Sequence, residues 1–153
     1  MDYIPQETYD TIIESIPICC VDVVIVNNGK FLLVKRTDEP AKNQWWLPGG
    51  RVIKGETLKR CAHRKALDEV GLNCYVGPIV HTDETIFDTG PSNISIHSIN
   101  VCFLLYPKNN CNDVKLDRHS TLYRWDNGET LEFEAHPYVI KCLKGAGFLS
   151  NRP

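Results

Sequence analysis

The stretch GRVIKGETLKRCAHRKALDEVGL, residues 50–72, decides the fold expected of this chain. A glycine turn comes first, followed by a helical pattern that carries Asp68 and Glu69 and stops at Gly71. Thr57 is a favourable N-cap residue, and glycine is the usual left-handed stop at a helix C-terminus. We therefore expect a helix from Thr57 up to Gly71, with two acidic side chains in its last turn.

The two carboxylates suggest a metal site. A helix C-terminus favours cations over carboxylates, and a bound divalent cation would offset that cost. Mg²⁺ prefers a few carboxylate oxygens together with waters and substrate phosphates. The glycine turn lets a backbone carbonyl approach such an ion closely. The alternative is a solvated helix with ordinary i,i+4 ion pairs, Arg64 with Asp68 and Lys65 with Glu69.

Composition and charge limit the class of protein. A chain of 153 residues is expected to form one domain, residues 1–153, and 42% hydrophobic with 24% charged residues is ordinary for a globular protein. A net charge of −2 gives no reason to expect nucleic-acid or membrane partners. There is no apolar run of about 18 residues and no secretory signal, so we expect a cytoplasmic protein. The seven cysteines are scattered and odd in number, which favours packed free thiols.

Hydrophobic periodicity predicts helices and strands in alternation. Asn28-Gly29 between two apolar runs is a strong hairpin signal, and Pro48-Gly49-Gly50 is expected to break the strand before it. The expected helices are residues 5–15, 57–70 and 137–144, and the expected strands are residues 18–26, 31–35, 45–47, 74–80, 85–87, 94–106 and 122–125. Such a mixture predicts an α/β fold with a mixed sheet between helices.

Residues 50–72 also resemble the Nudix box: Gly, five residues, Glu, seven residues, Arg-Glu-aliphatic, one residue, Glu-Glu, one residue, Gly-aliphatic. The positions that match are Gly50, Glu56, Arg64, Ala66, Asp68, Glu69, Gly71 and Leu72. Two positions depart from the box, since Asp68 replaces a Glu and Lys65 stands where a metal-binding Glu is usual. The resemblance implies a Nudix-type α/β/α sandwich with a mixed β-sheet.

The box also implies a metal set. Glu69, Asp68 and the Gly49 carbonyl are the expected ligands, for Mg²⁺ or alternatively Mn²⁺. Lys65 should reduce the number of ions held, to one, and either meets a phosphate or pairs with Glu69. Glu56 and Arg64 are expected to hold the loop to the helix.

Flanking segments resemble the GDP-mannose mannosyl hydrolase branch of Nudix enzymes, which also lacks the Glu at position 65. The segments are IPICCVDVVIV (16–26), LLVKRT (32–37) and PAKNQWWLPGGRVIKGETL (40–58). The branch implies a Mg²⁺-dependent hydrolase that displaces the nucleoside diphosphate from C1 of the sugar and leaves free sugar. The N-terminal helix resembles one used in dimers of this branch, so a homodimer is expected.

Matching residues carry the expected roles. Arg36 and Arg51 match arginines that bind the diphosphate leaving group, where a planar guanidinium gives paired hydrogen bonds. Asp22 matches an acidic residue that touches substrate. His119 precedes Tyr123-Arg124-Trp125 and is the candidate catalytic base, although an offset of one residue could put it at a metal-ligand position. His97 is a second candidate for the base, and the remaining histidines are expected to be structural: His63, His81 and His136.

Two other functions remain open at this point. One is an ordinary Nudix pyrophosphohydrolase that attacks phosphorus in another nucleotide derivative. The other is a non-catalytic module that binds nucleotide sugars. Trp45 is open in the same way, because it could stack on a base or belong to the core.

Overall fold

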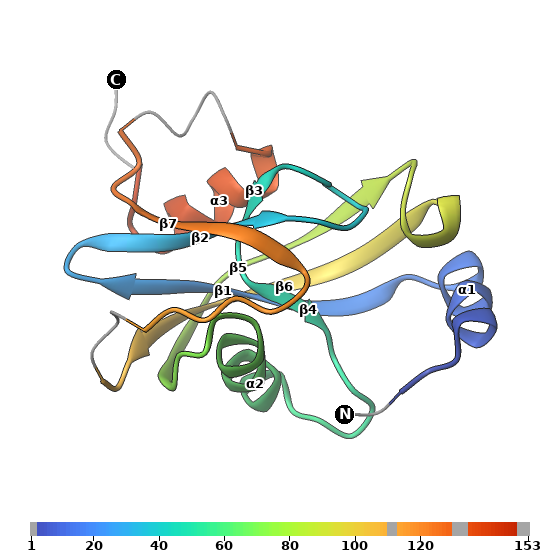
Figure 1. Cartoon of the computed structure of the whole chain (residues 1–153), viewed down its shortest axis with the longest axis horizontal. Helices are drawn as coiled ribbons and strands as arrows, with labels where there is room; N and C mark the ends of the chain where they lie inside the picture. Colours follow the sequence, from blue (N-terminus) through green and yellow to red (C-terminus); the bar gives the residue numbers. More distant parts are fainter. Residues whose placement is uncertain (1–2, 110–112, 130–134, 150–153) are drawn as a thin grey trace.

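The computed structural model describes residues 3–109, 113–129 and 135–149. In these residues seven strands form one mixed sheet, in the order β3-β2-β1-β6-β5, with β4 paired to β1 and β7 to β2. Helix α2 lies on one face of the sheet, α3 lies on the other, and α1 packs at one end near β6 (Figure 1). The expected α/β/α sandwich with a mixed sheet is confirmed.

The elements follow the chain in this order: α1 (Gln6–Ser15), β1 (Ile18–Asn27), β2 (Lys30–Arg36), β3 (Trp45–Trp46), β4 (Gly49–Arg51), α2 (Leu58–Val70), β5 (Cys74–Phe87), a short 3₁₀ helix η1 (Pro91–Asn93), β6 (Ile96–Pro107), β7 (Ser120–Asp126) and α3 (Pro137–Gly145).

Strand β1 is central to the sheet. Its end forms the predicted hairpin with β2, in which Asn28 and Gly29 both take positive φ angles, 52° and 74°. The rest of β1 runs parallel to β6 from Ile18 to Ile25. Its middle is almost entirely buried, as expected of a strand covered on both faces.

The helix α2 packs through small residues. Ala62 and Ala66 are fully buried against the sheet, together with Val70, and Leu58 packs at the margin of the same cluster. Alanine at two successive contact positions lets the helix axis lie close to the strands. This packing fixes the height of the last turn of α2, where Glu69 is located, above the sheet.

Two details differ from the expected elements. Residues 74–87 form one strand where two were expected, with register shifts around Pro78 because proline cannot donate to the ladder. Gly49–Arg51 forms the strand β4, where only a strand break was expected. It pairs with residues 20–22 of β1, in the part of that strand that the hairpin leaves open.

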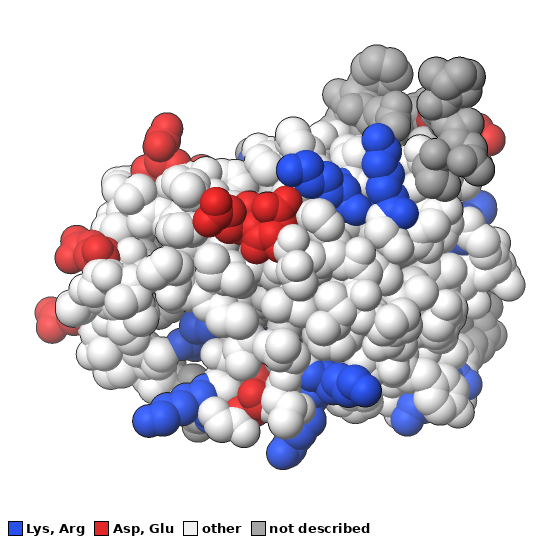
Figure 2. Space-filling view, turned by 180° about the vertical axis from the view of Figure 1, so that it is seen from behind, with Lys and Arg blue, Asp and Glu red and all other residues white. Residues whose placement is uncertain are grey.

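The surface seen from behind has a broad area without charged side chains, with separate groups of acidic and basic side chains around it (Figure 2). The outer strand β5 exposes Tyr75, Ile79 and Ile86. In the described ranges no helix has the length and apolar character needed to span a membrane. The six described cysteines are free thiols, and Cys111 lies outside the described residues.

Candidate active site

Helix α2 is bounded by the residues expected of it. The Thr57 hydroxyl accepts a hydrogen bond from the Arg60 N–H, and Gly71 closes the helix at φ 71° in the left-handed region. The Leu72 N–H bonds back to the Ala66 carbonyl, which completes the C-terminal cap. These caps set where the last turn of α2 ends and therefore which way Glu69 points.

Glu69 is the buried carboxylate of this last turn, with only 8% of the residue exposed. One of its oxygens accepts the Gly49 N–H at 2.8 Å, and the other lies 3.1 Å from the Lys65 ammonium. Burial raises the pKa of Glu69, and the Lys65 charge and the Gly49 hydrogen bond act in the opposite direction. Of the two roles considered for Lys65, the structure has the ion pair with Glu69.

The glycine turn is held tightly between β1 and α2. A Cβ on Gly49 would overlap Asp22 Oδ1 and come within 2.5 Å of the Val21 carbonyl oxygen. A Cβ on Gly50 would lie 2.8 Å from Cε of Lys65. Glycine at both positions therefore allows the turn to approach the carboxylate of Asp22 on one side and the end of Lys65 on the other.

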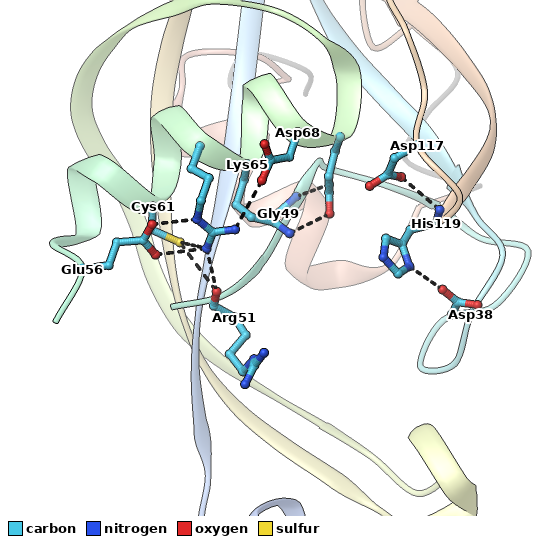
Figure 3. A network of polar contacts seen from close by, with 11 residues as sticks. Asp38, Gly49, Arg51, Glu56, Cys61, Lys65, Asp68, Asp117 and His119 are labelled. Carbon is cyan, nitrogen blue, oxygen red and sulfur yellow. Dashed lines mark hydrogen bonds and ion pairs between the residues drawn. The ribbon is translucent and has the colours of Figure 1, made fainter. Parts of the chain in front are cut away.

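Glu56 and Arg64 join the loop to the helix, as expected. Arg64 donates to Glu56 from Nε at 2.6 Å and from Nη2 at 3.0 Å, and Nη2 also reaches the Arg51 carbonyl at 3.2 Å (Figure 3). The hydrogen bond from Arg64 is the main reason that the pKa of Glu56 falls to about 2. Asp68 lies 3.6 Å from Arg64 and its side chain is 47% exposed, so its carboxylate has a different environment from that of Glu69.

The residues around Glu69 are compatible with the Mg²⁺ or Mn²⁺ that Nudix hydrolases generally use. Across the described residues no three acidic, histidine or cysteine side chains converge into a metal-binding group. Each Glu69 oxygen has one partner and keeps further acceptor capacity, and Asp117 is close enough to raise the pKa of Glu69. Mg²⁺ accepts such a sparse protein set because waters and substrate phosphates complete its coordination.

Arg36 and Arg51 lie at the ends of β2 and β4. Arg36 donates from Nε to the Pro40 carbonyl at 2.8 Å, and its charge lowers the pKa of Asp22, although burial has the larger, opposite effect. The Arg51 guanidinium lies 5.3 Å from the ring centre of Tyr9 in α1. Arg36 is therefore near the buried carboxylate, whereas Arg51 is directed toward α1.

His119 contacts Asp38 through its ring and Asp117 through its backbone. The ring Nδ1 lies 2.7 Å from Asp38 Oδ2, and the backbone N–H donates to Asp117 Oδ1 at 2.9 Å (Figure 3). The Thr37 N–H donates to the His119 carbonyl, and the Asp117 N–H donates to the Glu69 carbonyl. The loop before β7 is thereby tied to the end of α2 and to the loop after β2.

A family model of the NUDIX domain matches residues 19–138. The chain belongs to the Nudix family. The membership expected from residues 50–72 is thus confirmed.

Relatives of this Nudix protein are named for different activities. The low-salt glycan biosynthesis protein Agl8 of Haloferax volcanii is 37% identical over 86 residues, which are 56% of this chain and 55% of Agl8. An ADP-ribose pyrophosphatase of Methanocaldococcus jannaschii is 33% identical over 89 residues, 58% of this chain and 50% of that protein. The chain thus spans about half the length of these curated relatives.

Solved structures of the family share the fold. The MutT protein from Methanosarcina mazei superposes with a TM-score of 0.70 at 26% identity, covering 87% of this chain and 96% of that one. A MutT Nudix hydrolase from Burkholderia pseudomallei gives 0.73 at 20% identity, covering 86% and 98%.

The other histidines of this Nudix domain have partners of their own. His97 of β6 lies 2.8 Å from Glu84 of β5, at an exposed position on the sheet. His63 meets Asn73, His81 meets Asp83, and the His136 ring accepts from the first turn of α3. Trp45 lies with its ring 4.7 Å from the Arg124 guanidinium and packs partly against the core, so its face is already occupied by a cation.

Three residues beside this candidate site were not predicted from the sequence. Asp117 approaches Glu69 from the loop before β7, and Asn100 and Tyr138 both bond to Asp22. Asn100 could have been noticed as an amide inside an apolar strand, where a polar side chain needs a partner. Asp117 and Tyr138 give no such signal, because nothing in their neighbourhoods predicts which strand or helix they meet.

Proposed function

We propose that this Nudix protein is a Mg²⁺-dependent hydrolase of nucleoside diphosphate sugars, of the GDP-mannose type, that releases free sugar and nucleoside diphosphate. The observation that carries the proposal is Lys65, whose ammonium lies 3.1 Å from Glu69 where a further carboxylate is usual in the box. One positive charge in that place lowers the number of divalent ions that the helix can hold. A single ion suits charge neutralisation on a leaving diphosphate better than activation of a water for attack on phosphorus.

Glu69 and the Gly49 carbonyl are the proposed protein ligands, with Asp68 as a further carboxylate on the same turn. When bound, Mg²⁺ supplies electrostatic stabilisation of the charge that builds up on the diphosphate. The burial of Glu69 and the sparse donor set around it support Mg²⁺ over a metal that needs a full protein cage.

Arg36 and Arg51 are proposed to bind the diphosphate. A guanidinium donates two parallel hydrogen bonds to phosphate oxygens and stays charged at every relevant pH. Each hydrogen bond to a charged group contributes about 1.5–3 kcal/mol. Arg36 is proposed to act in catalysis as well, because charge accumulates on the diphosphate as the sugar bond breaks.

His119 is proposed as the general base. Its Nδ1 is engaged by Asp38, which leaves Nε2 to take a proton from water. The water oxygen attacks C1 of the sugar, and the bond from C1 to the diphosphate oxygen breaks with its electron pair going to the diphosphate. The proton of the water goes to Nε2. The ties from the His119 backbone to Asp117 and Thr37 support a fixed position for the imidazole.

A nucleotide pyrophosphohydrolase is the second candidate. It is favoured by the carboxylate pair that α2 retains and by the relative from M. jannaschii named an ADP-ribose pyrophosphatase. The name of Agl8, a glycan biosynthesis protein, favours a sugar substrate instead.

Hydrolysis of GDP-mannose and other nucleotide sugars in ¹⁸O-labelled water with Mg²⁺ separates these functions. Attack at carbon gives labelled free sugar and unlabelled nucleoside diphosphate. Label in a phosphate product, with sugar phosphate and nucleoside monophosphate released, would replace the proposal by the second candidate. Binding without turnover across the panel would indicate a non-catalytic module.

The proposed enzyme is a homodimer. Exposed apolar side chains gather near the α1 end of the sheet, with Ile16 59%, Ile86 65% and Ile99 44% exposed. The chain has a mass of 17.4 kDa, so light scattering after size exclusion should give about 35 kDa. A mass near that of one chain would contradict the dimer.

A further inference from the structure

A row of buried polar side chains leads from the outer strand β5, across β6, to Asp22 of β1 beside the glycine turn. On the α3 face, the hydroxyls of Thr85 and Ser98 are 2.7 Å apart, and Ser98 donates to Asn100 Oδ1 at 2.9 Å. Asn100 then donates from Nδ2 to Asp22 Oδ2 at 3.0 Å. All four residues are at most 8% exposed, so the row lies under the surface of the protein.

Two donors converge on one oxygen of Asp22. Besides Asn100, the Tyr138 hydroxyl of α3 donates to Oδ2 at 2.6 Å. No described residue donates a hydrogen bond to the other oxygen, Oδ1. This second oxygen faces Gly49, since a Cβ on that glycine would overlap it. The carboxylate is thus turned so that its free oxygen points to the turn proposed to hold the metal and the diphosphate.

We propose that Asn100 and Tyr138 are positioning residues that hold Asp22 with Oδ1 ready to accept a hydrogen bond from a sugar hydroxyl of the substrate. This inference rests on the proposed function, because it takes the ligand beside Gly49 to be a nucleotide sugar. Thr85 and Ser98 act through Asn100, whose amide oxygen they occupy, so that its Nδ2 is turned toward Asp22.

Burying the Asp22 carboxylate has a free-energy cost. An Asp that is 4% exposed is unfavourable unless its oxygens are paired, and among the described residues only Oδ2 has hydrogen-bond partners. A purely structural network would pair both oxygens or would be replaced by apolar groups without loss. The unpaired oxygen next to the glycine turn is instead what a site for a hydroxyl donor requires, because the ligand supplies the missing hydrogen bond.

A site built around such a bond discriminates by the presence of one hydroxyl. Loss of a hydrogen bond to a charged group changes affinity or kcat/KM by about 10- to 150-fold. The kcat/KM of the wild-type protein should therefore be lower by this factor for one monodeoxy form of the sugar than for the parent sugar, and much less reduced for the other monodeoxy forms. Asp22→Asn should show nearly the same kcat/KM for that deoxy substrate and for the parent substrate.

The test compares Tyr138→Phe and Asn100→Leu with the wild type on GDP-mannose and its monodeoxy analogues. Tyr138→Phe removes only the hydroxyl and keeps the ring stacked 5.8 Å from Trp46. We expect both variants to lose most of the preference for the parent sugar over the one discriminated analogue. Tyr106→Phe is the matched control, because it removes a hydroxyl from an exposed tyrosine of β6, and its preference should be unchanged.

The outcomes separate the inference from the proposed function. If Asp22→Asn loses the preference and both positioning variants keep it, the inference is wrong and the function stands. If the wild type turns over no nucleotide sugar, the proposed function fails. The preference for the parent sugar over its monodeoxy analogues is then measured by calorimetry, as the ratio of their Kd values with Mg²⁺ present. Equal Kd for the parent and every deoxy sugar in the wild type would then overturn the inference as well. If Asn100→Leu does not fold, Tyr138→Phe alone decides.

Discussion

Replacing Glu56 with Gln should destabilise the protein at neutral pH and have little effect near pH 2. Glu56 accepts from Arg64 at 2.6 and 3.0 Å and from the Ile53 N–H at 3.1 Å. The Glu56 and Arg64 side chains are only 12% and 22% exposed. Glutamine keeps the shape of the side chain but removes its charge and directs a donor toward the guanidinium.

The size of the effect follows from the pKa of Glu56, which falls from 4.5 to about 2 chiefly because of the hydrogen bond from Arg64, with further contributions from the Ile53 N–H and the Arg64 charge. At about 1.36 kcal/mol for each pKa unit, the whole shift corresponds to roughly 3.4 kcal/mol. Solvent at the edge of the pair screens part of this, which leaves on the order of 2 kcal/mol. Because the folded-state pKa is the lower one, this stability is present above pH 4.5 and is lost as the pH falls toward 2.

Urea unfolding, followed by tryptophan fluorescence, measures the difference between Glu56→Gln and the wild type. With a slope of about 2 kcal/mol per molar urea, the midpoint of the variant should lie about 1 M lower at pH 7. The gap should narrow between pH 4.5 and 2.5. Asp68→Asn is the control, because its carboxylate is 3.6 Å from Arg64 and half exposed, and its loss should stay below about 0.5 kcal/mol.

Two results would refute the reasoning. A midpoint shift below about 0.3 M at pH 7 would mean that the pair contributes little to stability. A gap that keeps its full size at pH 2.5 would mean that the loss comes from altered packing of the side chain, since protonation of Glu56 in the unfolded state should by then have removed most of the stability that the charge contributes.

Three further outcomes are expected. Glu69→Gln should lower Mg²⁺-dependent activity by more than the ~10–100-fold loss that is typical of residues that only orient a metal ligand, and its circular dichroism spectrum should be unchanged. Full activity of this variant would show that Glu69 does not bind the metal. Asp38→Asn should lower kcat about 10-fold at unchanged KM, which is less than the ~10²–10⁴-fold loss expected for His119→Ala. Equal losses in the two variants would contradict the role of Asp38 in orienting His119. Gly49→Ala should lower the free energy of unfolding in urea by about 3 kcal/mol or more, because the new Cβ meets backbone and a buried carboxylate. Gly50→Ala should lower it by about 1 kcal/mol, because its Cβ meets only the flexible end of a lysine. A larger loss for Gly50→Ala than for Gly49→Ala would contradict this geometry.

Features that depend on neighbours a few residues apart were predictable. The helix bounded by Thr57 and Gly71, the Asn28-Gly29 hairpin and the i,i+4 pair of Lys65 with Glu69 all follow from local geometry. The resemblance to the Nudix box predicted that Glu56 and Arg64, eight residues apart, hold the loop to the helix, and in the structure they form an ion pair at 2.6 Å.

Strand extents were harder to predict. The sequence pattern indicated two strands within residues 74–87, and it assigned no pairing to Gly49–Arg51. In both cases the partner strand decides: β6 holds the long β5 together across its irregularities, and the free edge of β1 accepts the glycine turn. Propensity cannot anticipate a hydrogen-bonded partner that is distant in sequence.

The sequence by itself determined the family, the central helix and its caps, and the place of Glu69 in the last turn of that helix, because these depend on spacing within one turn and one helix. Only the tertiary structure decided how Asp22 is turned, through Asn100 and Tyr138, which are 78 and 116 residues away. The same holds for His119, which meets Asp38 across 81 residues. Such contacts depend on the parallel register of β1 with β6 and on the packing of α3 and the loops, and these form only when the whole core is assembled.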